Sequence, residues 1–577
     1  MTRSGQLSLR LSRDDRRLSF APILAILCLL SLLDPLGSPA RADPADAGLE
    51  AAAEHIRPDS IRGHMGFLAD DLLEGRRPGT RGQQLAAKYV AAWFGAIGLK
   101  PAGNEGTYLQ NVPLRHSMLV KEKSTITLRY DGTAEDLVYG RDFLMQGDFA
   151  NKEMNVSGGL VFVGFGITAP ELKHNDYADI DARGKIVVLL SGAPASFPHN
   201  QRAFYSSDQQ KMLNAVAHGA VGVLSVFTPQ DSGRYPWEWL MPQFEMGGMC
   251  WVAQDGALHN DFFGYVSQLR GDAFLSRPAA ERVFRHTTHS LVEVFAAAKT
   301  GKVQGFDLRV DASIRTVSKI QPVDSPNVAA VLRGSDPSLR DEYVVITAHS
   351  DHLGVGKPVN GDAIYNGAVD DASGVAAVIE IARTFARLAE PPRRSLLFLV
   401  VTGEEMRLLG SDYFAHHPTV PWDGIVANIN IDALLVFHPL LDTVAIGAEH
   451  SSLGGAVGHA MSAMGLKVGP DPAPEEVMFI RNDAYSFVRQ GVPAVLLLPG
   501  MNSGDPKRDG LAMLKDWLKS RYHTPKDDMG QPLDFEAGAK FTQACFRFAY
   551  EVATEKQRPT WTVGDFFGDK FGRKAGR

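Results

Sequence analysis

The sequence predicts an α/β protein with a mostly parallel mixed sheet flanked by helices and interrupted by an inserted β-rich domain. Three observations lead to this prediction. From about Asp307 onward, short apolar runs alternate with helical patterns, which is typical of parallel strands joined by crossover helices. Residues 116–300 instead contain several strand patterns in close succession. Polar residues also gather where the later apolar runs end, at the sheet edge where α/β proteins carry their chemistry.

These patterns divide the chain into four segments. We expect residues 1–42 to be an export signal and residues 43–115 to form a helical part of the main domain. Residues 116–300 would form the inserted domain, and residues 301–577 would complete the main domain. A loop rich in glycine and charge, residues 72–80, is interpreted as a plain connection between two helices.

The first 42 residues have the pattern of a cleaved export signal. Several arginines precede an apolar run from Ser19 to Leu33. The small residues Ala40 and Ala42 then lie just before the expected cleavage point. The apolar run is short for a membrane-spanning helix, which needs about 20 residues. We therefore expect an exported protein, periplasmic or secreted, without a stable membrane span after cleavage.

Charge and cysteine content narrow the possible partners. The formal net charge is −7 and the sequence has no long basic run, so a nucleic-acid partner is not expected. Cys250 and Cys545 lie beyond the signal, where they could form a disulfide or remain buried thiols. The oligomeric state is left open.

The main domain begins as alternating strands and helices. The predicted strands are Asn327–Leu332, Tyr343–Thr347, Leu396–Val401, Ile425–Ile431, Thr443–Ile446 and Ala494–Leu498. The predicted helices are Ser373–Arg387, Gly410–His416, Leu453–Met464, Asp483–Gln490 and Phe535–Glu551.

A histidine and several carboxylates follow the ends of these strands or open the next helix. They are His349, Asp370, Glu404, Glu405 and Asp432. Because the carboxyl ends of parallel strands meet at one edge of a sheet, we expect these side chains to lie close together. Crowded carboxylates would raise each other's pKa, and a bound cation would remove that conflict.

The donor types suit a zinc centre. His349, the carboxylates and a later histidine, His523, provide nitrogen and oxygen ligands without a thiolate, which fits Zn²⁺ or a similar divalent ion. One zinc takes about three protein ligands and a water, and this set is larger. It therefore predicts two ions bridged by one carboxylate, about 3.5–4 Å apart.

Five short segments, taken in chain order, resemble the metal motifs of the co-catalytic di-zinc aminopeptidase family. Members of this family include secreted bacterial aminopeptidases, glutamate carboxypeptidase and the transferrin receptor ectodomain. These short segments span residues 348–352, 369–374, 403–405, 430–432 and 522–525. The resemblance covers nearly the whole chain after the signal. It implies the zinc exopeptidase fold, with a protease-associated domain inserted over roughly residues 145–300.

The resemblance also implies a ligand set. His349 and Asp432 would hold one zinc, and Glu405 and His523 would hold the other. Asp370 would bridge the two ions, giving two Zn²⁺ per chain.

Three further roles are implied by the same motifs. Glu404 would be the general base, outside the metal ligands. Asp351 would accept a hydrogen bond from the free nitrogen of His349, and Tyr522 would stabilise an oxyanion. His352, His416, His417 and His438 are interpreted as structural or rim residues.

The implied function is an exported aminopeptidase acting on peptides. A carboxypeptidase of the same fold is the first alternative and would need arginines for the substrate's terminal carboxylate, such as Arg481, Arg508 or Arg521. A glutaminyl cyclase with one zinc and a binding ectodomain without catalysis are the others. Ala484 stands where family members often have a histidine, which leaves the substrate contacts near Arg481 and Asp483 open.

Overall fold

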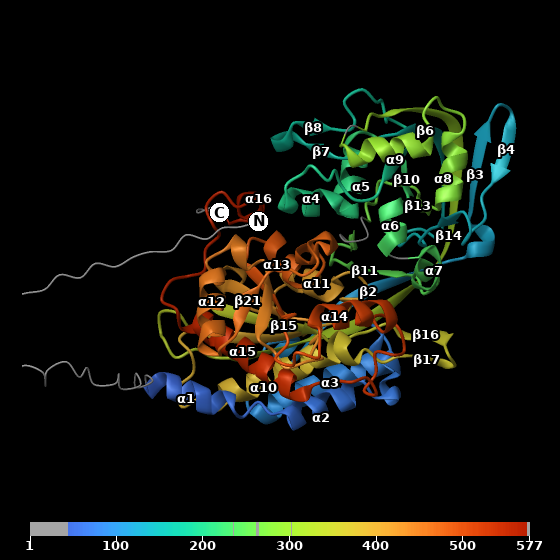
Figure 1. The fold of residues 1–577 in the computed structure, drawn as a ribbon. Helices are drawn as coiled ribbons and strands as arrows, with labels where there is room; N and C mark the ends of the chain where they lie inside the picture. Colours follow the sequence, from blue (N-terminus) through green and yellow to red (C-terminus); the bar gives the residue numbers. More distant parts are fainter. Residues whose placement is uncertain (1–43, 235, 261–264, 302, 574–577) are drawn as a thin grey trace, which may run out of the picture. The chain divides into compact units, whose positions relative to one another are not determined.

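The main sheet is centred on four mutually parallel strands in the order β18–β15–β19–β22. Their bounds are Ser395–Val401, Tyr343–His349, Ile425–Ile431 and Ala494–Pro499. Every residue of these strands is buried, as expected when helices cover both faces of a parallel sheet. Long apolar runs therefore predicted the strands well, and the mixed α/β fold class is confirmed (Figure 1).

The computed structural model describes residues 44–234, 236–260, 265–301 and 303–573. The predicted signal, residues 1–42, lies outside the described residues. The chain divides into two units, Met1–Glu50 and Ala51–Arg577, and the described part of the first is the start of helix α1 (Pro44–Ala53). Within the described ranges, no helix combines the length and apolar character that crossing a bilayer requires.

Antiparallel strands extend the main sheet on both sides. On one side β14 pairs with β18, β2 with β14, and β11 with β2. On the other side β20 pairs with β22, and β21 runs parallel to β20. The bounds are Phe306–Leu332 for β14, Leu109–Leu119 for β2, Gly248–Val252 for β11, Asp442–Ile446 for β20 and Lys467–Gly469 for β21. The short strands β1 (Lys100–Pro101) and β12 (Leu258–His259) pair with β14 and β11.

Helices cover the main sheet on both faces. Four of them pack together below it in Figure 1: α2 (Pro58–Leu68), α3 (Arg81–Ile97), α10 (Ser373–Ala386) and α15 (Phe535–Thr554). Helices α11 (Leu409–His416) and α13 (Ala484–Arg489) pack against each other. Local sequence sets the ends of α3, because the Thr80 hydroxyl accepts the Gln83 N–H at its start and Gly98 takes a left-handed conformation at its end.

A second sheet lies within the range predicted for the insertion except for its strand β14, which begins at Phe306. Its strands run in the order β4–β3–β14–β6–β9–β10–β13–β5. Apart from β14, their bounds are Thr133–Asp136, Thr125–Tyr130, Glu153–Phe162, Ile186–Leu190, Gly222–Val226, Asp272–Leu275 and Phe143–Leu144. The helices of this region are α4 (His199–Ser206), α5 (Asp208–Ala217), α6 (Pro229–Arg234), α7 (Trp237–Glu245), α8 (Arg277–Phe284) and α9 (Leu291–Lys299).

Strand β14 belongs to both sheets. Its first part pairs with β3 and β6 of the second sheet, and from Ser318 onward it pairs with β2 of the main sheet. The chain thus returns to the main sheet at Ser318, later than the expected Asp307, because the strand pattern alone does not say which partner a strand pairs with. Strand β11 also pairs in the main sheet although it lies inside the range 116–300. The four-segment division remains a prediction.

The remaining predictions for the main domain agree closely with the structure. The predicted helices correspond to α10, α11, α12 (Leu453–Ala463), α13 and α15. Helix α14 (Gly510–Ser520), α16 (Phe566–Phe571) and the hairpin β16–β17 (Gly354–Val359, Asp362–Tyr365) had not been predicted. Cys250 and Cys545 are free and buried, so they do not pair with each other.

Candidate metal centre

The carboxyl ends of the parallel strands deliver the predicted side chains to one place. His349 is the last residue of β15, Glu404 and Glu405 lie shortly after β18, and Asp432 directly follows β19. Asp370 precedes α10 by three residues. The predicted convergence of these side chains is therefore observed.

The first part of the centre surrounds His349. Its Nε2 atom lies 3.2 Å from an oxygen of Asp370 and 3.5 Å from an oxygen of Asp432. Both His349 and Asp370 are buried. These three side chains have ligand atoms within 4.8 Å of one another, which is compatible with one shared cation.

The second part surrounds His523, in the segment after α14. Its Nε2 atom lies 3.2 Å from the other oxygen of Asp370 and 3.1 Å from an oxygen of Glu405. Asp370 thus turns one carboxylate oxygen toward each imidazole. This is the arrangement that a bridging carboxylate between two ions requires.

His352 is also part of this group, although the sequence did not assign it a role there. Its Nδ1 atom lies 2.6 Å from the Glu405 oxygen that does not face His523, and its ring is fully buried. His352, Asp370 and Glu405 form a second set of ligand atoms within 4.8 Å. The signal in the sequence was the position of His352 only three residues after His349, the last residue of β15.

Asp351 connects the imidazole of His349 to the turn that carries the two glutamates. Its carboxylate oxygens accept the backbone N–H groups of Glu404 and Glu405 at 3.2 and 3.3 Å. His349 Nδ1 lies 3.2 Å from the backbone oxygen of Asp351 and 3.7 Å from the nearer carboxylate oxygen. Nδ1 of His349 thus faces Asp351, whose backbone oxygen lies nearer to it than the carboxylate.

A further buried carboxylate, that of Asp371, holds the loops of the centre together. Asp371 accepts backbone N–H groups from His349, Gly374 and Ala433, at 3.1, 2.8 and 3.0 Å. It thereby ties the ends of β15 and β19 to the start of α10.

Arg76 plays a similar part with the opposite charge. Its buried guanidinium donates to the backbone oxygens of Ser350 and Gly367, each at 2.9 Å, and also to those of Leu68 and Asn366. Residues 72–80 are therefore more than the plain connection that we expected. A single arginine could not be singled out from the sequence, because its partners are backbone atoms far along the chain.

The electrostatics of the group fit a cation. Burial favours a neutral imidazole, yet the surrounding carboxylates raise the pKa of His349 and His523 well above the usual value. Burial raises the pKa of Asp432, and nearby carboxylates add to this. His349 Nε2 is buried and forms no well-aligned hydrogen bond within the described residues, as expected of a ligand atom that points at an ion. The donor set and this orphaned atom fit zinc.

Glu404 lies beside this group and borders two cavities. Removal from water raises the pKa of its carboxyl group well above the usual value; His349 opposes this shift and the Asp432 carboxylate reinforces it. Burial likewise raises the pKa of Asp483 to about 7. A carboxylate with a raised pKa is suited to exchanging protons near neutral pH.

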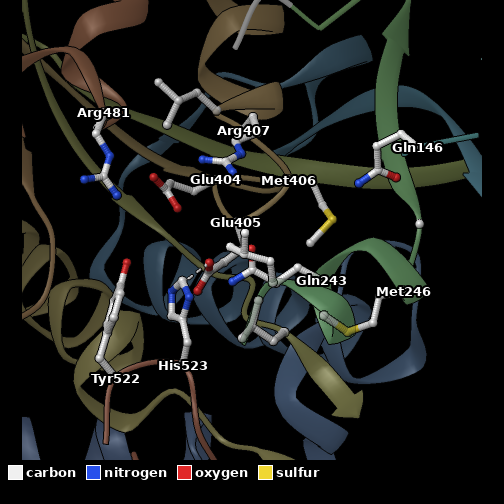
Figure 2. Close-up of a pocket in the computed structure, with 14 residues that line it drawn as sticks. Gln146, Gln243, Met246, Glu404, Glu405, Met406, Arg407, Arg481, Tyr522 and His523 are labelled. Carbon is white, nitrogen blue, oxygen red and sulfur yellow. Dashed lines mark ion pairs between the residues drawn. The ribbon is translucent and has the colours of Figure 1, made fainter. Parts of the chain in front are cut away.

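We call the first of these cavities the cationic cavity. It measures about 330 Å³, and its polar lining includes Gln146, Gln243, Glu404, Arg407 and Arg481. Figure 2 shows the guanidinium groups of Arg407 and Arg481 directed toward the carboxylate of Glu404. Gln243 comes from α7, whose part in the site the sequence did not reveal.

We call the second the apolar cavity. It measures about 640 Å³ and is lined mainly by apolar side chains, including Leu435, Met478 and Trp517. Asp370, Glu404 and Asp432 also border it. Tyr522 lines both cavities, and its ring stacks on the imidazole of His523 with centroids 3.8 Å apart.

Comparisons with known proteins agree with this arrangement. A probable zinc metalloprotease from Pyrenophora teres f. teres is 36% identical over 113 residues, which cover 20% of this chain and 23% of that protein. A vacuolar membrane protease from Ajellomyces capsulatus is 29% identical over 220 residues, which cover 36% of this chain and 19% of that protein. The chain thus spans about a quarter or less of the length of these curated relatives.

A solved structure extends the comparison to most of the fold. An aminopeptidase from Aneurinibacillus sp. strain AM-1 aligns with a TM-score of 0.52 at 18% identity, over 89% of this chain and 97% of the other. At this identity the likeness concerns the fold. Residues 327–549 match the model of peptidase family M28. This range contains the proposed metal ligands, His349, Asp370, Glu405, Asp432 and His523, and also Glu404. The similarity to peptidase family M28 thus covers residues 327–549, the part of the chain that carries the candidate metal centre.

Proposed function

We propose that this protein is an exported, zinc-dependent aminopeptidase that removes the N-terminal residue from peptides. The observation that carries the proposal is the position of Asp370, with its two carboxylate oxygens each 3.2 Å from a different imidazole. Glu404 lies next to this pair and faces two cavities. Export is supported by the pattern of residues 1–42 alone.

In this proposal two zinc ions bind per chain. His349 and Asp432 would hold one, Glu405 and His523 the other, and Asp370 both. Bound zinc lowers the pKa of water from about 15.7 to about 7 and polarises a substrate carbonyl. His352 would orient Glu405 by contacting the carboxylate oxygen that faces away from His523, and the distance of 2.6 Å supports this role.

The chain's own groups then move the proton. Glu404 takes a proton from the attacking water on a carboxylate oxygen and passes it to the leaving amine nitrogen. Its raised pKa supports this role. Asp351 keeps Glu404 in place through the backbone N–H, and the Tyr522 hydroxyl would donate to the oxyanion that forms at the carbonyl.

The choice of an aminopeptidase rests on the apolar cavity. A free α-amine is positively charged, and Asp370, Glu404 and Asp432 border that cavity. A carboxypeptidase remains the second candidate, because Arg481 lies in the cationic cavity together with Arg407. The two other arginines considered for that role pair elsewhere: Arg508 with Asp505 and Asp534, and Arg521 with Asp516.

The central experiment replaces Glu404 by Gln. We expect peptidase turnover to be lost while zinc content stays near two per chain, because Glu404 lies outside the proposed ligands. Glu390→Gln, at an exposed position, serves as the matched control and should leave both unchanged. Turnover retained in Glu404→Gln would contradict the mechanism, and a content of one zinc in the active wild type would favour a glutaminyl cyclase.

Removing the metal provides an independent check. A chelator should abolish activity and added zinc should restore it. Peptides blocked at the amino or the carboxyl end then separate an aminopeptidase from a carboxypeptidase. A protein that binds two zinc ions but hydrolyses neither kind of peptide would instead be a binding ectodomain.

A further inference from the structure

We propose that Arg407 and Arg481 form a subsite for a substrate carboxylate, located just beyond the bond that is cleaved. The preferred substrates would then have an apolar N-terminal residue followed directly by a negatively charged group. This inference rests on the proposed aminopeptidase function and specifies the class of peptide that it acts on.

The lining of the cationic cavity is suited to an anion. Arg407 and Arg481 both border it, and Figure 2 shows both guanidinium groups directed toward its interior beside Glu404. The amide side chains of Gln146 and Gln243 add uncharged polar groups to the same lining. Two guanidinium groups with amide neighbours suit an anion with planar oxygens, because each guanidinium can donate two parallel hydrogen bonds.

The backbone at Arg407 supports a role for its side chain. Arg407 has φ 80° and the next residue, Leu408, has φ 59°. Glycine adopts this left-handed conformation at little cost, whereas a long side chain disfavours it. Residues held in such conformations are concentrated at ligand-binding and active sites, which is consistent with a binding role for this segment.

The two cavities offer different chemical groups to a peptide. The apolar cavity offers carboxylates and apolar walls, which suit an ammonium group and an apolar side chain. The cationic cavity offers the guanidinium groups of Arg407 and Arg481, of which the apolar cavity shares only that of Arg481. This difference favours one direction of binding, with the amino terminus in the apolar cavity and a carboxylate in the cationic cavity.

The bond to be cleaved lies at the boundary between the two cavities. Glu404, Arg481 and Tyr522 line both cavities, so the boundary between them lies at the proposed general base. The N-terminal residue then occupies the apolar cavity, and the following residue lies in the cationic cavity. Arg481 is held at this boundary by Glu476, whose carboxylate lies 3.0 Å from its Nη1 atom.

A carboxylate at the following residue can have two sources. It can be the C-terminal carboxylate of a dipeptide, or the side chain of an aspartate or glutamate in second position. Both have the planar oxygens that the two arginines recognise. The experiment uses one pair of peptides for each source.

The zinc-loaded full chain is assayed with four peptides that share an N-terminal leucine. The pair Leu-Gly and Leu-Gly-amide tests the terminal carboxylate, and the pair Leu-Asp-amide and Leu-Asn-amide tests the side chain. We expect kcat/KM to be at least about tenfold higher for the charged member of one or both pairs, as for other hydrogen bonds to charged groups. Similar values within both pairs would overturn the subsite and leave the aminopeptidase function standing.

Variants connect the preference to the two arginines. Arg407→Gln and Arg481→Gln should each lower the ratio within a pair toward one, mainly by slowing hydrolysis of the charged peptide. Arg508→Gln is the matched control, because Arg508 lies outside both cavities and should keep the wild-type ratio. The ratio is measured within one preparation, so a partly unfolded variant still gives a valid result, and an unchanged ratio in both variants would overturn the assignment.

An N-acetylated peptide separates this inference from the function on which it rests. Acetyl-Leu-Gly lacks the free amine, so an aminopeptidase should not cleave it. If it is cleaved as fast as Leu-Gly, the aminopeptidase function is wrong, whereas a preference for the charged peptide would still support the subsite. Absence of hydrolysis for all of these peptides would overturn both.

Discussion

The buried carboxylate of Asp527 accepts the backbone N–H of Asp370 at 3.1 Å. It also accepts the N–H of Val369 at 3.0 Å and the side-chain amide of Gln531 at 2.6 Å. Asp527 lies four residues after His523, so this carboxylate joins the loop that carries the bridging candidate to the segment that carries the second imidazole. The spacing between the two halves of the centre depends on this connection.

Replacing Asp527 by Asn should therefore weaken zinc binding. An asparagine keeps one acceptor oxygen but turns an N–H₂ group toward an N–H that needs an acceptor, so the loop shifts. We expect zinc affinity to fall about 10- to 100-fold, as for other groups that support metal ligands. Competition with a chelator measures this, and Asp528→Asn is the control. Equal affinities in wild type and Asp527→Asn would show that the connection does not set the spacing.

Replacing Arg76 by Lys should lower stability. The guanidinium donates to four backbone oxygens from separate segments, and an ammonium group cannot reach all four in the same geometry. A buried carbonyl left without a partner costs about 1–3 kcal/mol of unfolding free energy. Urea unfolding of the zinc-loaded protein measures the change. The exposed Arg81 provides the control variant Arg81→Lys, and a loss of the same size in both would contradict the prediction.

The two histidines beside Glu405 should differ in what they do. His523 faces both Asp370 and Glu405, whereas His352 contacts the far oxygen of Glu405. We expect His523→Ala to lose one of two zinc ions, and His352→Ala to keep two with weaker affinity. Metal analysis after dialysis distinguishes them. Loss of an ion in His352→Ala, with two ions kept in His523→Ala, would exchange their roles.

Buried Lys211 should make stability depend on pH in the alkaline range. Its ammonium donates to the backbone oxygens of Phe165 and Leu190, at 2.6 and 3.0 Å, and burial lowers its pKa from 10.5 to about 8. Between these two values the unfolded chain binds more protons than the folded one, so stability rises with pH. The unfolding free energy therefore decreases as the pH falls from 10.5 to about 8. The total decrease is about 3 kcal/mol.

Lys211→Met removes this titration. Compared with wild type, the variant should show a smaller rise in unfolding free energy between about pH 8 and pH 10.5. Urea unfolding at several pH values measures the difference. Lys152→Met, at an exposed position, should follow the wild-type curve, and a Lys211→Met curve parallel to wild type would refute the expectation.

Much of the main sheet was predictable from local sequence. Strand β19 has the predicted bounds, and β15 and β18 differ from theirs by one or two residues, because strands buried on both faces read as unbroken apolar runs. The convergence of His349 and Asp432 followed from the direction of parallel strands alone. These are consequences of short-range pattern and sheet geometry.

Other parts of the site depend on contacts that sequence pattern does not encode. Arg76 acts on backbone oxygens, which any residue could supply at those positions. Arg407 stands out only once its backbone angle and its cavity are known. His352 was interpreted as a structural or rim residue, because its contact with Glu405 depends on a loop arrangement that sequence spacing does not give.

Strand β14 has a consequence for attempts to transplant the insertion. In its first part, alternate residues from Leu308 to Ser318 are buried, whereas Ser325 and Asn327 are buried farther along, so the inward-facing positions change from even to odd. A graft or deletion that altered the number of residues between Ser318 and Ser325 by one would turn apolar side chains outward in one of the two sheets. Exchanging this segment between related proteins therefore requires junctions that change the number of residues between Ser318 and Ser325 by an even number or not at all, so that the buried positions of β14 remain buried.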